Sequence, residues 1–434
     1  MRMNTYLPLI GIACACLATA QTGAPVSLTL KDAEALALKN HPQVQAAQHA
    51  VAAQDQRIVQ SRAAYYPGVT GVATGSQGNI GARIGAGYLS DSRLFNRFGD
   101  GVEISQLITD SGRTANLVAQ SRLLRNAADQ TFQATRFDVL MAVNQAYFDV
   151  LRAQGTVKVA QETVAARQSL VDQVTALANN KLRSELDVSF ADVSRSEAQL
   201  LLIRAQAQVQ GAFAELARAL GSQQTATYRL GEEPLPPSPA QNPEDLVAQA
   251  LKDRPELASL RFSRDAAYRL EQAERDLSRP TVSFMAVAGY MPYIDQITLP
   301  HVIPNEYEGA AVNVSVPIFN GHLFSARREE AHERALESDQ HVRDLEDSIA
   351  RDVRAAWALS LTAYQQLDVT AQLLREATLG MSLAQGRYNL GLASIVELTQ
   401  AQLNVTSAEI ENLAAKYGYQ AQYAELQYAI GALR

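Results

Sequence analysis

The alternation of hydrophobic and polar positions predicts the same order of elements in each half of the chain. Residues 30–65 are rich in Ala, Gln and Leu and are predicted to form a helix that ends at Pro67. Residues 245–278 are predicted to form its counterpart, which ends at Pro280, with Pro255 interrupting the first turns. Each half therefore begins with a helix that a proline terminates.

After each of these prolines the hydrophobic period changes from helical to two, which is typical of β-strands. The clearest case is 311–316, where valines at every second position alternate with small or polar residues. The four predicted strands are 69–74, 102–105, 281–290 and 311–316, and the paired strands are joined by the loop-like segments 75–99 and 291–306.

Each half is predicted to continue with a very long helix and a returning helix. Residues 322–390 contain no proline, and a helix of about 65 residues is on the order of 100 Å long. Large and small side chains recur along it in steps of three and four, which indicates coiled-coil packing. The returning helix carries one apolar stripe through Leu403 and Ile410 and a second through Leu398 and Val405. Two stripes indicate neighbours on two sides, as in a closed ring of helices.

The two halves are related by duplication. Pro42 and Pro67 recur as Pro255 and Pro280 at one constant offset, and Gly221 recurs as Gly431 at a similar offset. The period is too long for the short solenoid repeats. We therefore expect a first structural repeat over 21–221, a Pro-rich linker over 222–241 and a second repeat over 242–434.

Residues 1–20 are predicted to be a secretory signal peptide, with a basic start, an apolar stretch and an A-x-A sequence at 18–20. Both cysteines, Cys14 and Cys16, fall inside this leader, so the expected mature protein has no disulfide. The alternative is that Cys14 or Cys16 becomes the acylated first residue of a lipoprotein.

Charge and motifs exclude several classes of function. The formal net charge is −7, and no long block of Lys and Arg is available to bind nucleic acid. Past the leader there is no apolar run of about 18 residues, so a membrane-spanning form is expected to be a barrel. His332-Glu333 lacks the second His of a zinc-protease motif. We expect no enzyme, no catalytic residue, no metal and no cofactor.

Strands with one apolar face favour an oligomer. The open edges of four strands would leave backbone groups unpaired in hydrocarbon, and closing a barrel takes about 8 strands. Two copies would close a filled barrel, whereas three copies would enclose a pore. The alternative is a soluble periplasmic coiled-coil adaptor or scaffold protein, which shares the hairpins but has no use for such strands. An exported hydrolase lacks any nucleophile constellation.

Three local sequences carry a family resemblance. R-Y-N-L-G-L-A-S-I-V-E-L at 387–398 is similar to a hairpin tip with an R-Y/F-x-x-G turn before a returning helix. V-P-I-F-N-G at 316–321 lies at the exit from the fourth predicted strand, and Q-L-I-T-D-S-G at 106–112 follows the second; both are similar to the same family pattern. Together with the duplicated order of elements, they make nearly the whole mature chain resemble the TolC-like outer-membrane efflux protein family.

The resemblance implies a mainly α fold with a small β part, built as a trimer. A twelve-strand outer-membrane β-barrel is continued by a twelve-helix periplasmic α-barrel in that family. The implied function is the exit channel of a tripartite efflux or type I secretion system, a passive duct gated at its periplasmic tip. The implied partners are a periplasmic adaptor (membrane fusion) protein, an inner-membrane transporter and outer-membrane lipid.

The resemblance also places a gate at the tips of the two hairpins. It carries the gate onto Asp187, Tyr388, Glu397 and Gln400, with an Asp to Tyr hydrogen bond as a latch and a ring of Glu397 carboxylates that attracts cations. The tip residues expected to face the adaptor are Asn180, Lys181, Leu182, Arg183 and Ser184, and Asn389, Leu390, Gly391, Leu392, Ala393 and Ser394.

The tips also depart from the family pattern. Lys181 stands where the family turn often has Gly, and Ala393 stands where some members have a basic residue. Gln400 replaces an acid of some members, so the constriction is expected to carry less negative charge. The halves differ from each other at the tips, and we expect gating and partner choice to depend on these differences.

Overall fold

The structure is a computed structural model that describes residues 27–77, 97–222, 228–294 and 305–433. The predicted leader 1–20, with Cys14 and Cys16, lies outside the described residues. So does most of each loop predicted over 75–99 and 291–306.

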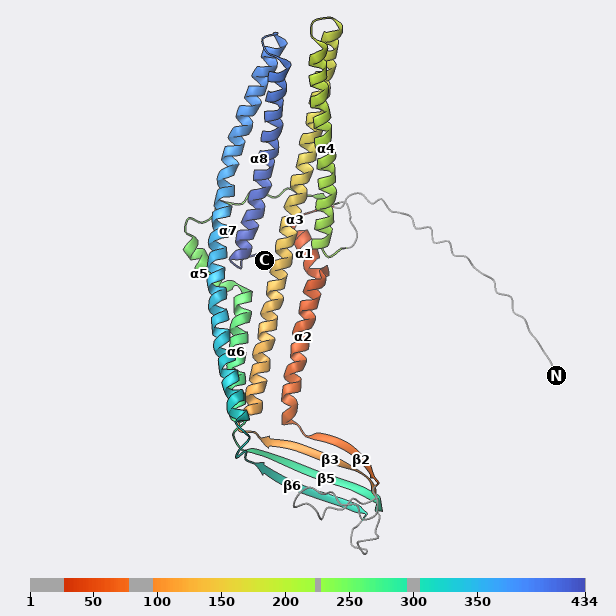
Figure 1. Cartoon of the computed structure of the whole chain (residues 1–434), viewed down its shortest axis with the longest axis vertical. Coiled ribbons are helices and arrows are strands. Elements are labelled where there is room, and N and C mark those ends of the chain that lie inside the picture. The colour runs from red at the N-terminus through yellow and green to blue at the C-terminus, as the bar shows by residue number, and fades with distance from the viewer. Residues whose placement is uncertain (1–26, 78–96, 223–227, 295–304, 434) are drawn as a thin grey trace, which may run out of the picture.

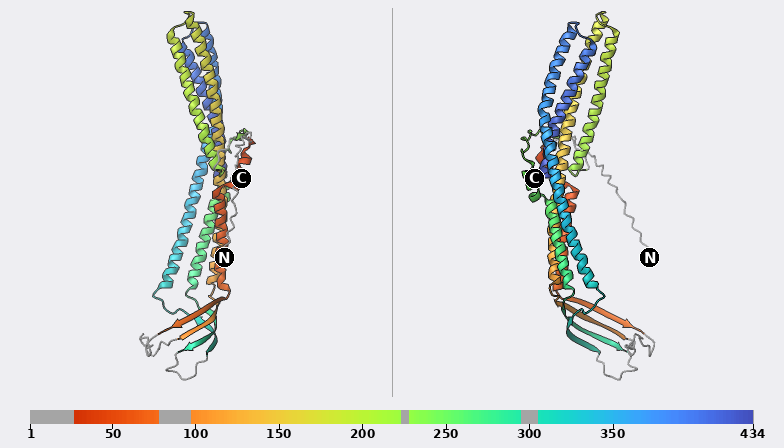
Figure 2. Two further views of the ribbon diagram at one scale, coloured as in Figure 1. Left: turned by 90° about the vertical axis from the view of Figure 1, so that its right-hand side faces the viewer. Right: turned by 60° about the vertical axis from the view of Figure 1, so that its left-hand side comes forward.

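The described chain is a long shaft of helices with one sheet at its end (Figures 1 and 2). The helices are α1 (Leu30–Asn40), α2 (Pro42–Arg62), the short 3-10 helix η1 (Ala63–Tyr65), α3 (Arg113–Asn179), α4 (Glu185–Ala219), α5 (Pro243–Asp253), α6 (Pro255–Asp276), α7 (Leu323–Asn389) and α8 (Ile395–Ala429). The strands are β1 (Ser27–Leu28), β2 (Gly68–Ser76), β3 (Arg97–Thr109), β4 (Arg229–Leu230), β5 (Thr281–Ile294) and β6 (Glu306–Ser315).

The duplicated order predicted from the sequence is confirmed. Both long helices, α3 and α7, have 67 residues, and both returning helices, α4 and α8, have 35. Near the sheet α2 packs along α3 and α6 packs along α7, while toward the tips α4 and α8 take these places (Figure 1). No helix among the described residues is long and apolar enough to cross a bilayer.

Prolines divide both N-terminal helices, so the prediction of one helix over 30–65 is wrong. Pro42 has no N–H group to continue a helix, and it becomes the first residue of α2. His41 before it is extended, with φ −67° and ψ 126°, and its Nδ1 accepts a hydrogen bond from the Gln43 amide at 3.3 Å. Arg254 and Pro255 produce the same break between α5 and α6.

Four strands form one antiparallel sheet in the order β2-β3-β5-β6. The pairing of β3 with β5, in which Ile104 lies opposite Ala286, joins the two halves. β3 is much longer than the predicted 102–105, because pairing with β2 and β5 extends it over a Gly-containing stretch with no clear alternation.

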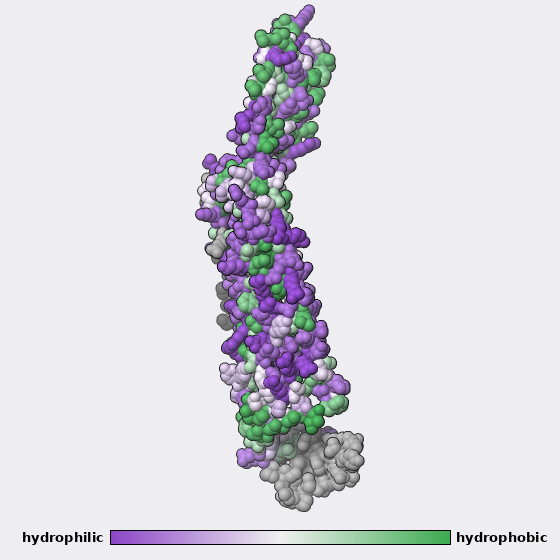
Figure 3. All heavy atoms as spheres, turned by 90° about the vertical axis from the view of Figure 1, so that its left-hand side faces the viewer, coloured by the Kyte–Doolittle hydropathy of each residue, from purple (hydrophilic) through white to green (hydrophobic). Residues whose placement is uncertain are grey.

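The sheet is uncovered within one chain. Val312 and Val314 of β6 are 63% and 60% exposed, and β2 and β6 each pair on one side only within the described ranges. On the face drawn in Figure 3, hydrophobic side chains gather at the sheet end while the shaft beside it is mostly hydrophilic. In a single chain this apolar sheet therefore has two edge strands whose outer backbone groups need further strands to pair with.

The waist of the molecule is where the end of each returning helix meets the proline break of its own half. A Cβ on Gly221, which has φ +71°, would lie 2.8 Å from the Cα of His41. Its counterpart Gly431, with φ +73°, would approach the Asp253 carbonyl to 3.1 Å. The recurring glycines and prolines therefore form one packing arrangement that is built twice.

Two aromatic counterparts tie the inter-repeat linker to this waist. The Tyr147 hydroxyl is fully buried and lies within hydrogen-bond distance of the carbonyls of Leu28 and Gly231, at 3.0 and 2.7 Å. In the second half the Trp357 indole N–H donates to the Ala240 carbonyl at 2.7 Å. The linker is therefore held by side chains of both long helices.

Tyr147→Phe is expected to lower the free energy of unfolding by about 1–3 kcal/mol, because the Gly231 carbonyl loses the hydroxyl that donates to it at 2.7 Å. The measurement is guanidinium-induced loss of helical circular dichroism in the purified protein. Trp357→Phe is the comparison, and it is expected to cost less because Trp357 is only half-buried. Equal effects of the two variants would contradict this account.

Candidate functional site

The turn between α3 and α4 places Lys181 in a left-handed conformation, with φ +60°. The Leu182 amide donates to the Leu177 carbonyl at 2.9 Å, and the Lys181 amide donates to the Ala178 carbonyl at 2.8 Å. These two bonds close the helix end in the manner of a Schellman motif, which glycine usually completes.

The turn between α7 and α8 has the same geometry with a glycine. Gly391 has φ +75°, its amide donates to the Tyr388 carbonyl at 3.0 Å, and the Leu392 amide donates to the Arg387 carbonyl at 2.8 Å. Lys181 therefore accepts a steric cost of about 1–2 kcal/mol that Gly391 avoids.

Serine caps begin both returning helices. The Ser184 hydroxyl accepts from the Leu186 amide at 3.0 Å, and the Asp187 carboxylate accepts from the Ser184 amide at 3.3 Å. In the second half the Ser394 hydroxyl accepts from the Glu397 amide at 3.2 Å. Within this chain the carboxylate of Asp187 thus caps the N-terminus of its own helix, α4.

Tyr388 is the central residue between the two hairpins. It is 1% exposed and packs in a cluster with Leu170, Val174 and Leu398, yet its hydroxyl has no hydrogen-bond partner among the described residues. Burial raises the pKa of Tyr388, the charge of Arg183 opposes this, and the charge of Asp187 adds to it.

Arg183 connects the first hairpin to Tyr388 of the second. Its Nη2 donates to the Tyr388 carbonyl at 3.0 Å, and its guanidinium lies 4.5 Å from the centre of the Tyr388 ring. The expected Asp187 to Tyr388 hydrogen bond does not form within this chain. Sequence reasoning placed Arg183 at the tip but missed this contact, which pairs residues from different halves.

The two other predicted gate residues lie on α8 and are exposed. Arg387 Nε lies 3.3 Å from Glu397 Oε1, and Gln400 donates to Asn404 at 3.0 Å. Arg387 and Glu397 are 57% and 45% exposed, so solvent screens the pair and its contribution is small. The charge of Glu397 is nevertheless partly balanced inside its own hairpin.

The remaining tip residues present an apolar end to solvent. Leu182, Leu390 and Leu392 are 69%, 75% and 68% exposed, whereas Ala393 is buried. Asn389 accepts from Gln385 at 3.0 Å, and Asn180 donates to the Ala176 carbonyl at 2.8 Å. A hollow of about 440 Å³ between the turns is lined by Gln173, Leu177, Leu182, Arg183, Tyr388, Asn389, Leu390 and Gly391.

A four-stranded sheet below two long helical hairpins, built from a duplicated unit, defines the class of outer-membrane channels. The family described as outer membrane efflux protein matches the chain over residues 35–222 and again over 246–432. The chain belongs to this family. The family consists of channels, and the predicted fold class and the predicted class of efflux or secretion channel are confirmed.

Individual relatives extend over most of the chain. The outer membrane efflux protein BepC of Brucella suis is 24% identical over 92% of this chain and 84% of its own length. The alkaline protease secretion protein AprF of Pseudomonas aeruginosa is 28% identical over 94% of this chain and 85% of its own. The structure of CusC covers 93% of this chain and 92% of its own at a TM-score of 0.79 and 19% identity, which supports the fold.

Lys181→Gly is expected to stabilise the first turn by about 1 kcal/mol, because glycine adopts the left-handed conformation without the steric cost. Amide hydrogen exchange of a peptide covering 177–184 is expected to slow roughly fivefold. Gly391→Ala is the opposite control, and exchange at the second turn is expected to accelerate. Unchanged or faster exchange in the Lys181→Gly variant would argue against strain at this turn.

Proposed function

We propose that the chain forms, as a homotrimer, the outer-membrane exit duct of a tripartite efflux or type I secretion system. The match of the channel family to both halves of the chain carries this proposal. An inner-membrane transporter supplies energy and substrate, and a periplasmic adaptor joins it to the duct. The duct itself moves substrate without catalysis.

The architecture supports three copies. One chain supplies four strands to the sheet, and a cross-section through its shaft contains two helices from each half. Two copies would close a barrel of about 8 strands, which its own side chains fill, whereas three would enclose a pore of about 12 strands. Closure would also pair the free edges of β2 and β6 and turn the exposed valines of the sheet toward lipid.

The hairpin tips are proposed to be both the gate and the adaptor-docking surface. Exposed leucines at both turns, Leu182, Leu390 and Leu392, offer an apolar end that suits packing against another helical tip. Behind them, Arg183 holds the two hairpins together through the ring and carbonyl of Tyr388. We propose that the closed state depends on this clamp, that Asp187 positions it by capping α4, and that Glu397 and Gln400 line the constriction.

Arg183→Gln is expected to open the tip, because it removes a charged hydrogen bond that contributes about 1.5–3 kcal/mol. The fraction of open time in planar-bilayer recordings is expected to rise roughly tenfold or more. Arg195→Gln is the matched control, since Arg195 pairs with Asp192 on its own helix at 3.0 Å and, among the described residues, has no hydrogen bond or ion pair to the second hairpin. Equal open times in wild type and Arg183→Gln would rule out the clamp.

Tyr388→Phe distinguishes between two ways of holding the gate closed, the Arg183 clamp and a hydrogen bond between Asp187 and the Tyr388 hydroxyl. The phenylalanine ring keeps the stacking surface and the backbone carbonyl that Arg183 contacts, so conductance is expected to stay at the wild-type level. Tyr388→Ala removes the ring and is expected to open the tip as Arg183→Gln does. Opening by Tyr388→Phe alone would instead favour a latch through the hydroxyl.

A further inference from the structure

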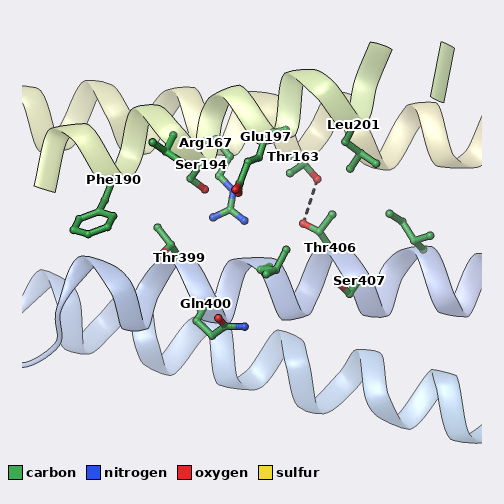
Figure 4. A pocket seen from close by; sticks show the side chains of 14 residues that line it. Thr163, Arg167, Phe190, Ser194, Glu197, Leu201, Thr399, Gln400, Thr406 and Ser407 are labelled. Atoms are coloured by element: carbon green, nitrogen blue, oxygen red, sulfur yellow. Dashed lines mark hydrogen bonds between the residues drawn. The ribbon is translucent and has the colours of Figure 1, made fainter. Parts of the chain in front are cut away.

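A recess lies between α4 and α8 on the tip half of the shaft, and α3 beside α4 contributes part of its lining (Figure 4). Its volume is about 550 Å³, within the range of sites that hold drug-sized molecules. The lining residues come from α3, α4 and α8, and they include Thr163, Arg167, Phe190, Ser194, Leu403 and Ser407.

Arg167 of α3 is aimed into this recess (Figure 4). It is 4% exposed, and its Nη1 has no hydrogen-bond partner among the described residues. Burial lowers the pKa of Arg167, while the charge of Glu197 raises it, but the two groups form no ion pair. A buried guanidinium stays charged and carries a desolvation cost that an anionic partner would offset.

Apolar side chains from both α4 and α8 form part of the recess wall. Phe190 and Val193 of α4 are 43% and 58% exposed, and Leu403 of α8 is 50% exposed. The floor holds hydroxyl groups, with Thr163 and Thr406 hydrogen-bonded to each other at 3.3 Å. The recess thus combines the buried positive charge of Arg167 with apolar side chains, hydroxyls and the exposed carboxylate of Glu197 at its edge, which suits an amphiphile with no more than one anionic group.

The recess shares one lining residue with the constriction proposed above. Gln400, proposed above to line the narrowest part of the duct, is also one of the residues that line the recess. The recess is therefore assigned to the inner wall of the duct, beside the gate. A molecule in it would lie on the route of the exported substrate.

We propose that this recess is a binding site for an amphiphilic organic monoanion, held by its carboxylate or sulfonate on Arg167 with its apolar body against Phe190 and Leu403. Exposed Glu197 at the same recess disfavours a second negative charge on the ligand. This inference rests on the proposed duct. It predicts that amphiphilic monoanions bind transiently in the tip half of the duct during export.

The test measures binding of naphthalene-1-acetate and of its neutral amide, naphthalene-1-acetamide, to the channel in lipid nanodiscs by titration calorimetry. Empty nanodiscs provide the blank. Wild type is expected to bind the acetate about tenfold or more tightly than the amide, and Arg167→Gln is expected to lose that preference. Arg204→Gln is the matched control, because Arg204 is exposed on α4 outside the recess and carries the same charge change.

A second variant tests the location. Ser407 is exposed and lines the recess, so Ser407→Tyr is expected to fill it and abolish acetate binding with Arg167 intact. Equal binding of the two probes by wild type, or wild-type acetate binding by either Arg167→Gln or Ser407→Tyr, would overturn the site. Bilayer recordings of the same preparations keep the two proposals apart, since channel current without acetate binding removes this inference and leaves the duct.

Discussion

Continuous lateral cover for two very long helices is the constraint on which this structure depends. Isolated helices draw little stability from propensity alone, so α3 and α7, each about 100 Å long, need packing partners along their whole length. The chain supplies these partners in two sets, α2 and α6 near the sheet and α4 and α8 toward the tips, and the two sets meet at the waist. There Gly221 approaches His41, and Tyr147 holds the linker against the long helix. A bulkier residue at the junction would separate the two sets of partners and leave the long helix open between them.

The same constraint explains why one chain is incomplete. Two helices of each half can cover one another only in part, and Leu200 and Ile203 of α4 remain 53% and 61% exposed. The sheet has the equivalent problem in its hydrogen bonds, because β2 and β6 end it on both sides. Assembly around an axis resolves both at once, since each exposed flank would meet the opposite flank of a neighbouring copy.

The sequence predicted those parts of the fold that local periodicity controls. The expected helix over 322–390 matches α7 almost to the residue, because heptad steps and the lack of proline are local signals. The length of β3 was underestimated, because cross-strand pairing extends it beyond its own alternation. At the site, the family resemblance located the tips. The contact of Arg183 with Tyr388 and the burial of Arg167 could not be predicted from the pattern of a single helix. Both contacts depend on how helices from the two halves pack against each other.

Backbone strain at the first turn, together with a buried hydroxyl on Tyr388 that has no partner among the described residues, fits a region that has to move. Lys181 occupies a left-handed position, and Arg167, Tyr388 and Gln402 each keep a buried polar atom without a partner among the described residues. Such features are retained where a second arrangement of the same residues is needed. The aromatic groups at the waist differ, since the polar groups of Tyr147 and Trp357 are paired with linker carbonyls. A linker held firmly at the waist and a strained turn at the tip would together favour motion at the end of the duct, where a small shift of one hairpin against the other changes the opening most.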